Sequence, residues 1–243
     1  PVQFVKYLGN LLHGDFGPSY KYTGKTVNDF IATGAPVSAK LGLVTLVFVL
    51  LTSIPMGILA ALKNGKWQDM LLMAIATIGV TIPSFVIASM LIYVFSFKLN
   101  VLPTFGLDSW KSYILPVIAM GGYSVSYLRS SLLEVMGQDY IRTARAKGLT
   151  EFAVVTKHAL RNALIPVITV LGPTVAGLLT GSFVVEKIFA IPGIGYYFVN
   201  SVTQRDYTTI MGVTIFFAAF LMAMVLLVDI FYCLIDPRIK FDA

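Results

Sequence analysis

The sequence predicts an all-α membrane protein, a polytopic bundle of helices, and two observations carry this prediction. Apolar residues make up 57% of the 243 residues and charged residues only 12%, whereas an average soluble domain is about 25% charged. The 18 basic and 12 acidic side chains are too few to cover the surface of a soluble fold of this size. Long apolar stretches recur and alternating β patterns are absent, which favours helices over an outer-membrane barrel.

Five apolar stretches match the length of about 20 residues that a helix needs to cross the hydrocarbon of a bilayer. The third reaches that length if it extends to Val135, with Arg129 and Glu134 near the membrane edge. Prolines inside the stretches are compatible with helices in a membrane, where neighbouring groups satisfy the freed carbonyls. The predicted spans are residues 41–62, 70–97, 113–128, 163–185 and 208–235.

The positions of lysine and arginine predict the orientation. One side of the membrane, which includes the stretch 129–161, carries ten of them, and the other side carries eight spread over longer segments. The positive-inside rule therefore favours a cytoplasmic 129–161 stretch and an external N-terminal segment, residues 1–40, ahead of a transmembrane permease domain, residues 41–243. Because residues 1–38 contain no signal-peptide pattern, we expect a further span upstream, which gives six spans in the full gene product.

Few side chains suggest redox, metal or proton chemistry. Cys233 is the single cysteine, so an internal disulfide is excluded, and His13 and His158 have no metal-ligand spacing. Asp229 is the main ionisable residue inside a span, where acids are functional candidates. Its spacing from Asp236 favours a structural pair or a capped position, with Arg129 as another candidate partner.

The stretch 134–166 is the longest polar interval on the predicted cytoplasmic side. Residues 138–147 favour a helix, and Gly148 suits the left-handed residue that follows a helix end. Thr150 suits the N-cap of a second helix, with Glu151 in its first turn. We therefore expect a coupling loop at about residues 136–162, in which two short helices meet at Gly148.

The second helix of this loop has an apolar face by spacing. Phe152, Val155, Ala159 and Leu160 fall at i, i+3, i+7 and i+8. Two interpretations fit the pattern: a basic helix that rests on anionic lipid head groups, and a helix that docks into the groove of a soluble partner.

The residues of this loop resemble a known family. Tyr140-Ile-Arg-Thr-Ala-Arg-Ala-Lys-Gly148, followed by Lys157-His-Ala-Leu-Arg-Asn-Ala-Leu-Ile-Pro166, is similar to the cytoplasmic coupling loop of ABC-type importer permeases. The broad family has Glu-Ala-Ala, three residues and Gly; aligned on Gly148, those positions hold Arg142, Thr143 and Ala144, and only Ala144 matches. Downstream only Leu160 keeps the broad pattern. These departures are usual in the peptide-importer branch.

Other stretches agree with this branch, the oligopeptide type of the binding-protein-dependent peptide and nickel permeases. The segment Leu8-Gly-Asn-Leu-Leu-His-Gly-Asp-Phe-Gly17 resembles the external segment after their first span. Residues 180–195, Asp206-Tyr207 and residues 235–239 resemble their later outer and closing segments. The similarity extends over nearly the whole chain.

The resemblance implies a type I ABC importer permease fold and a set of partners. These are a second homologous permease subunit, two ATP-binding cassette ATPase subunits, an external substrate-binding protein, a peptide substrate and membrane lipid, without nucleic acid. ATP and Mg would be bound by the ATPase subunits, so this chain would hold no cofactor and would not itself be an enzyme. It would lie in the cytoplasmic membrane of a prokaryote and work by alternating access.

The resemblance also assigns roles within the loop. Gly148 would permit the sharp turn, Ala144 and Ala146 close packing on the ATPase, and Arg145 and Lys147 contacts with acidic residues of its groove or with solvent. The residues implied in ATPase coupling are Arg142, Thr143, Ala144, Arg145, Ala146, Lys147, Gly148, Phe152, His158 and Leu160.

Two glycine segments approach nucleotide-binding patterns and fail them. Gly24-Lys25-Thr26 ends like a phosphate-binding loop, but Ser19 stands at the first glycine position. Gly193-x-Gly195 is followed by Phe198 where a dinucleotide fingerprint has its third glycine.

Three alternatives stay open at this point. Within the family, the substrate could be a dipeptide, a nickel chelate or glutathione. From another class, an ion-coupled secondary transporter would need buried acids at the midplane, for which Asp229 is the available residue. A membrane scaffold for a cytosolic ATPase, without transport, is the third.

Overall fold

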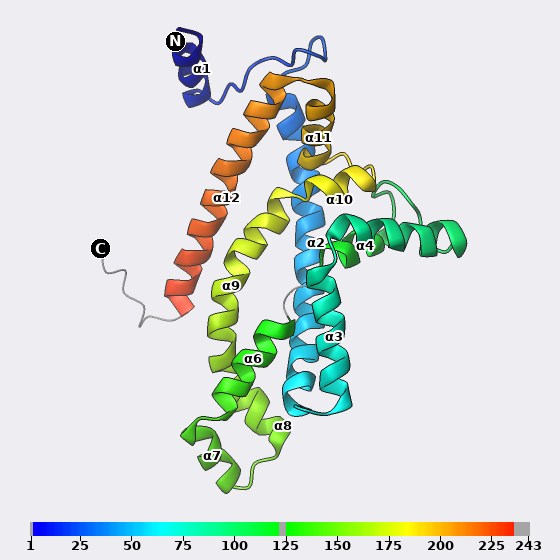
Figure 1. Cartoon of the computed structure of the whole chain (residues 1–243). Helices are drawn as coiled ribbons and strands as arrows, with labels where there is room; N and C mark the ends of the chain where they lie inside the picture. The colour runs from blue at the N-terminus through cyan, green and yellow to red at the C-terminus, as the bar shows by residue number, and fades with distance from the viewer. Residues whose placement is uncertain (1, 122–124, 236–243) are drawn as a thin grey trace. The chain divides into compact units, whose positions relative to one another are not determined.

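The computed structural model describes residues 2–121 and 125–235, and these residues form helices and no β-strand (Figure 1). This confirms the predicted all-α class. Residues 236–243, including Asp236, lie outside the described residues. The α-helices are α1 (Val2–Leu12), α2 (Val27–Leu62), α3 (Trp67–Thr81), α4 (Ser84–Leu91), α5 (Ile114–Met120), α6 (Val125–Met136), α7 (Asp139–Ala146), α8 (Glu151–Ala153), α9 (Leu160–Thr180), α10 (Phe183–Ile188), α11 (Ile194–Gln204) and α12 (Tyr207–Ile235). Short helices of other types are η1 (Ile92–Lys98), η2 (Trp110–Tyr113) and η3 (Val154–Ala159).

Two single helices among the described residues are long and apolar enough to cross a membrane: α2, with 36 residues, and the 24 residues Tyr207–Ile230 of α12. Two further pairs of consecutive helical segments are long and apolar enough to cross a membrane when each pair is counted as one span. They are Trp67–Thr81 with Ser84–Lys98 and Glu151–Ile168 with Pro173–Ile188. Length and composition therefore allow up to four spans in the described part of the chain. The predicted third span, 113–128, covers α5 and the start of α6 and includes residues 122–124, which lie outside the described part.

The spans differ in detail from their predicted limits. Helix α2 begins at Val27, well before residue 41. The predicted span 70–97 is not one helix, because the chain becomes extended at Ile82, immediately before Pro83. Proline disfavours the helical conformation of the residue before it. Helix α9, in contrast, contains Pro166 and Pro173 within its limits, as membrane helices tolerate.

The chain divides into two compact units. The first unit consists of Pro1–Thr45, Ser84–Met120 and Val175–Met224, and the second of Leu46–Pro83, Gly121–Thr174 and Val225–Ala243. Val27, Ile194 and Val213 form a buried cluster in the first unit. The second unit has a larger cluster, which extends from α6 through α7 and η3 into α9.

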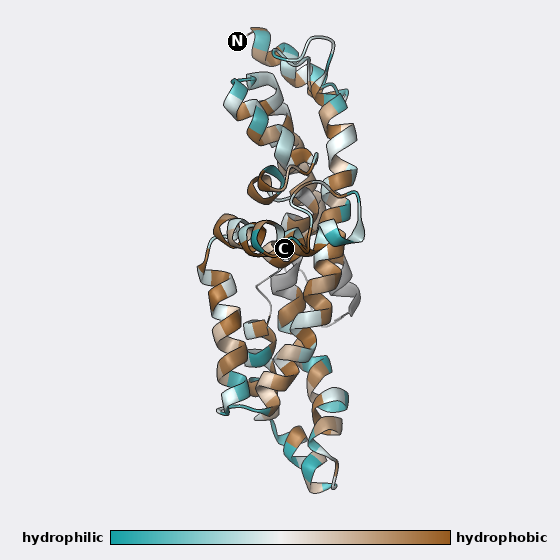
Figure 2. Ribbon diagram, turned by 90° about the vertical axis from the view of Figure 1, so that its right-hand side faces the viewer, coloured by the Kyte–Doolittle hydropathy of each residue, from teal (hydrophilic) through white to brown (hydrophobic). Residues whose placement is uncertain are grey.

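Hydropathy separates the helices from their connections. Figure 2 shows that the long helical segments are mainly apolar, whereas hydrophilic residues gather in loops and short helices. Large apolar side chains remain exposed on the long helices, among them Leu51 of α2 and Met222 of α12. Exposed apolar surface on this scale is typical of helices that face lipid or other membrane helices.

Candidate functional site

A turn at Gly148 joins two short helices into a compact knob, which we define as residues 138–160. Helix α7 ends at Ala146, and Gly148 has a φ of +78°, in the left-handed region that favours glycine. The Gly148 N–H donates to the carbonyl of Arg145 at 2.9 Å. The predicted helix–glycine–helix arrangement is therefore present.

Local caps hold the second half of the knob. Thr150 is the N-cap of α8, and its hydroxyl accepts a hydrogen bond from the Ala153 N–H at 3.4 Å. Glu151 stands in the first turn, as predicted. Its carboxylate accepts two bonds from the Arg145 guanidinium, Nε at 2.7 Å and Nη2 at 3.1 Å, and this hydrogen bonding raises the pKa of Arg145. Arg145 is thus already paired within the chain, whereas Lys147 is exposed.

The interior of the knob is apolar and continuous with the helices behind it. Ile141 and Ala144 of α7 pack in one cluster with Val154 and Val155 of η3. Ala144 is only 6% exposed, so its small side chain packs inside the knob. Ala146, by contrast, is exposed.

The predicted apolar face of the second helix is partly wrong. Val155 and Ala159 are buried and Leu160 packs against the cluster, but Phe152 is 68% exposed. The cause is the π-helical geometry of Val154–Ala159. A π-helix has bonds from i to i+5 and a wider turn, so a face counted with ordinary helical spacing drifts out of phase, and Val154 is buried in place of Phe152.

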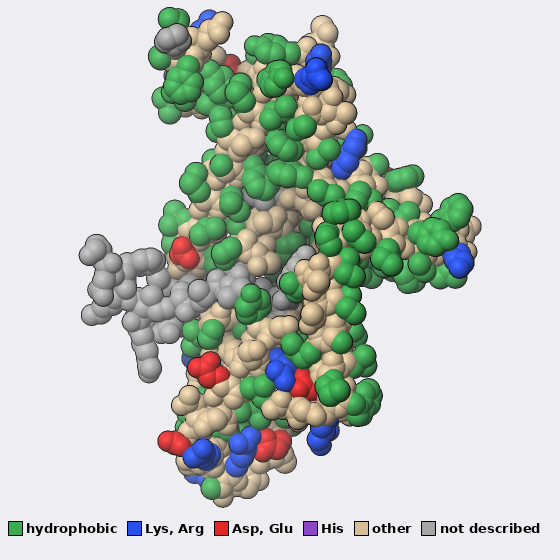
Figure 3. Space-filling view, in the orientation of Figure 1, with side chains coloured by type: hydrophobic (Ala, Val, Ile, Leu, Met, Phe, Trp, Pro, Cys, Tyr) green, Lys and Arg blue, Asp and Glu red, His purple; other side chains and the backbone are tan. Residues whose placement is uncertain are grey.

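The outer surface of the knob combines apolar and charged side chains. Leu149, at 41%, and Phe152 are exposed beside the turn. Arg142, Thr143 and His158 are exposed as well. Figure 3 shows basic and acidic side chains gathered over this end of the second unit. Exposed apolar side chains with a charged rim are typical of a protein docking surface.

Hydrogen bonds attach the knob to the helices that carry it. The Ser131 hydroxyl of α6 donates to the Ala163 carbonyl of α9 at 2.7 Å. The Asn162 amide donates to the Tyr140 hydroxyl at 2.7 Å. Helix α9 is therefore held to α6 and to the knob by side-chain hydrogen bonds as well as by the apolar cluster.

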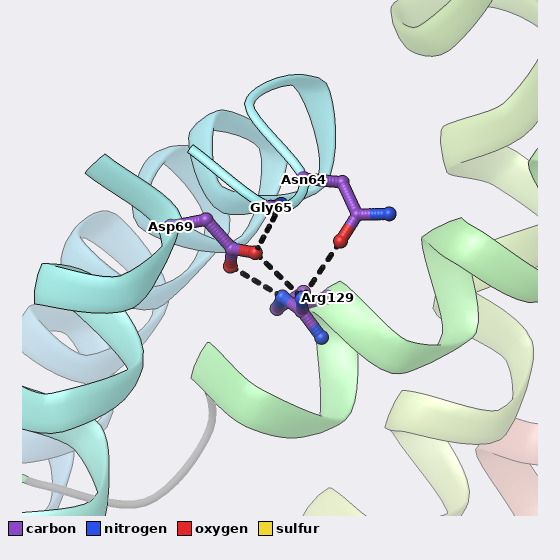
Figure 4. Close-up of polar contacts among 4 residues, drawn as sticks. All are labelled: Asn64, Gly65, Asp69 and Arg129. Atoms are coloured by element: carbon purple, nitrogen blue, oxygen red, sulfur yellow. Dashed lines mark hydrogen bonds and ion pairs between the residues drawn. The ribbon is translucent and has the colours of Figure 1, made fainter. Parts of the chain in front are cut away.

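Arg129 of α6 does not pair with Asp229, its expected candidate partner. It forms an ion pair with Asp69 of α3, with Nε 2.5 Å from Oδ1 and Nη2 2.6 Å from Oδ2 (Figure 4). Asp69 is 3% exposed, whereas Asp229 is exposed. The sequence shows Asp69 as an acid near the start of an apolar stretch, beside a basic loop. It does not identify Arg129 as the partner of Asp69.

The first unit contains a buried acid that sequence reasoning missed. Glu186 of α10 is fully buried, and its Oε2 accepts from the N–H groups of Gly195 (2.9 Å) and Tyr196 (3.3 Å). A Cβ on Gly193 would lie 2.3 Å from this oxygen. Gly193-x-Gly195 therefore makes room for a carboxylate at the start of α11. These two glycines, which have no side chain, were the signal that the sequence offered.

Asp206 is a second missed acid, between α11 and α12. It is buried, and it accepts hydrogen bonds from the hydroxyls of Ser19 (2.5 Å) and Thr209 (2.8 Å) and from the Tyr20 N–H (3.2 Å). Burial raises the pKa of the carboxyl, but these hydrogen bonds outweigh burial and hold the pKa below its usual value. Asp206 fastens the loop that contains Gly24 to the start of α12.

No group of three or more His, Cys, Asp or Glu side chains is placed to hold a metal ion within residues 2–121 and 125–235.

Comparison with known proteins gives one family. The model of the binding-protein-dependent transport system inner membrane component family matches residues 53–241. The dipeptide transport system permease protein DppB of Bacillus subtilis is 47% identical over 242 residues, which cover 98% of this chain and 79% of that protein. The oligopeptide transport system permease protein OppB of Haemophilus influenzae is 43% identical over 98% of this chain and 80% of its own length.

Solved structures of similar fold are ABC transporters. An inward-facing structure of the MetNI methionine ABC transporter matches with a TM-score of 0.71 at 18% identity, over 85% of this chain and 96% of the matched chain. An amino acid ABC transporter matches with a TM-score of 0.60 at 19% identity, over 87% and 95%. The fold is that of type I ABC importer permeases, as expected.

Proposed function

Since the chain belongs to the family of binding-protein-dependent transport system inner membrane components, we propose that it is the permease subunit of an ATP-driven peptide importer. It moves peptides across the cytoplasmic membrane by alternating access, and separate ATPase subunits hydrolyse the ATP. The similarity to peptide permeases supports the substrate class, because the two relatives described above transport dipeptides or oligopeptides by name.

The observation that carries the coupling role is the knob. Its two helices are held by the Gly148 turn and the Arg145–Glu151 pair, and Leu149 and Phe152 stay exposed. A preorganised apolar tip lowers the cost of ordering on binding and suits insertion into a groove. We assign docking on an ATPase subunit to the exposed residues Arg142, Thr143, Ala146, Lys147, Phe152 and His158, and a supporting role to Ala144 and Leu160.

The remaining subunits follow from the family's working unit. A sister permease would complete the substrate pathway, two ATPase subunits would each dock on one permease knob, and an external protein would deliver the substrate. With the knob in the cytoplasm, the excess of lysine and arginine in residues 129–161 agrees with the positive-inside rule. Dipeptide and oligopeptide import are both compatible with this chain, and the external binding protein selects between them.

Co-purification tests this proposal. The full gene product, tagged and extracted in mild detergent, should bring down ATPase subunits and a second permease in stoichiometric amounts, as identified by mass spectrometry. Recovery of the chain alone, under conditions that preserve a known membrane complex, would contradict the proposal and favour a secondary transporter. A complete complex without ATP-dependent uptake would instead favour the scaffold.

A further inference from the structure

Residues of the α2–α3 turn and of the start of α3 bind the guanidinium of Arg129. Arg129 of α6 donates Nε to Asp69 Oδ1 and Nη2 to Asp69 Oδ2 (Figure 4). Nη2 also donates to the Asn64 side-chain oxygen at 2.9 Å, and the Gly65 N–H donates to Asp69 Oδ2 at 2.9 Å. The middle of the turn, at Asn64, and the first turn of α3, at Asp69, are therefore both bound by a single side chain of α6.

Other side chains of α6 pack against the knob. Leu128 and Leu132, on either side of Arg129 in sequence, are buried in the cluster that contains Ile141 of α7 and Val154 of η3. Helix α6 is thus fixed to the α2–α3 turn by charged hydrogen bonds and to the knob by apolar packing. All of these residues lie in the second unit.

We infer that the Asp69–Arg129 pair is the positioning link that makes the α2–α3 turn follow the knob, so that movement of a docked ATPase reaches the membrane-spanning helices. This inference rests on the proposed function. Arg129 lies on α6 and Asp69 on α3, directly after the turn that follows α2, and α2 is long enough to span the membrane.

Two physical properties distinguish this contact from ordinary packing. A planar guanidinium that binds a carboxylate with both nitrogens fixes direction as well as distance, whereas apolar side chains can slide past one another. A buried ion pair also adds little net stability compared with apolar residues of the same volume. The pair is therefore better suited to keeping two elements in register than to stabilising the fold.

The test uses the complete transporter in proteoliposomes and measures the number of ATP molecules hydrolysed per labelled peptide imported. Arg129→Gln removes the guanidinium. Asp69→Asn keeps the shape of the Asp69 side chain and removes its charge, and the double variant removes both charged groups. Arg129→Lys keeps the charge and loses the two-pronged geometry. Lys66→Gln is the matched control, because it removes an exposed cation from the same turn without touching the pair.

We expect Arg129→Gln to assemble with the ATPase subunits and to import fewer peptides per ATP, by roughly twofold to thirtyfold, the range for residues that modulate coupling between distant sites. The double variant should be no worse than Arg129→Gln, because both remove one interaction. Arg129→Lys should be intermediate, and Lys66→Gln should keep the normal ratio.

Other results would overturn the inference. A normal ratio in Arg129→Gln, with hydrolysis and import unchanged or reduced in parallel, would make the pair a structural contact only. Failure of both Arg129→Gln and Arg129→Lys to assemble would make it a folding element. If the unmodified complex itself shows no ATP-dependent import, the proposed function fails, which is distinct from failure of the link.

Discussion

Arg145 and Glu151 form an ion pair across the Gly148 turn, with both guanidinium contacts at 2.7 and 3.1 Å. The pair joins the last turn of α7 to the first turn of α8, so the knob is closed within the chain itself. Both side chains are partly exposed, and such pairs stabilise by about 0–1 kcal/mol. The larger constraint is the left-handed residue between them.

Gly148→Ala should loosen the knob. A Cβ there meets no atom within 4 Å, so the penalty comes from the φ of +78° alone, at about 1 kcal/mol. Tryptic cleavage at Lys147 should rise about fivefold, because local opening becomes more frequent. Gly9→Ala in α1 is the control, since that site is also open but has no positive φ. Equal cleavage of both variants would show that the turn does not need glycine.

Phe152→Ala and Ile141→Ala should separate docking from folding. Phe152 is 68% exposed and Ile141 is fully buried. Phe152→Ala should leave the thermal stability of the chain within about 0.5 kcal/mol and weaken binding of the ATPase subunit by about thirtyfold, as for an interface hot spot. Ile141→Ala should destabilise the knob by about 2–5 kcal/mol. Unchanged ATPase affinity in Phe152→Ala, measured by titration, would place docking elsewhere.

Gly193→Ala should destabilise the first unit. The new Cβ would lie 2.3 Å from Glu186 Oε2 and 2.4 Å from Ser38 Oγ, both in buried surroundings. Forcing atoms into such a site costs about 1–3 kcal/mol. Thermal unfolding in detergent, with Gly9→Ala as the neutral comparison, measures the loss. Equal melting temperatures would mean that Glu186 moves aside freely.

Acid should release the loop that Asp206 fastens. The pKa of Asp206 is lower in the folded protein than its usual value, which is about 3.9 in an unfolded chain. Its stabilisation is therefore present above that value and is lost as the pH falls through the lower, folded pKa. Asp206→Asn should be less stable than the unmodified protein at pH 7, and the difference should shrink below about pH 4. A difference independent of pH would assign the effect to shape rather than charge.

Local signals predicted the turn of the knob well. Gly148, Thr150 and Glu151 act on neighbours a few residues away, so capping rules apply to them directly. The family resemblance and the apolar stretches likewise predicted the helical membrane fold. The prediction that Phe152 belongs to the apolar face was wrong because the sequence pattern does not indicate a π-helical turn.

Long-range pairings could not be predicted in the same way. Asp69 and Arg129 are 60 residues apart in sequence, and several acids compete for one arginine. One carboxylate oxygen of Glu186 accepts from backbone N–H groups, which leave no side-chain pattern to recognise. These contacts depend on how helices pack, and hydropathy alone does not determine that packing.

ATP-dependent uptake of a labelled peptide into proteoliposomes is the most direct measurement of the proposed function. The vesicles would contain the purified complex and the external binding protein, with ATP supplied to the side of the knob. We expect uptake that requires ATP, stops with a non-hydrolysable analogue and falls in Phe152→Ala. Uptake driven by an ion gradient without ATP, or none in a fully assembled complex, would contradict a role in ATP-driven peptide import.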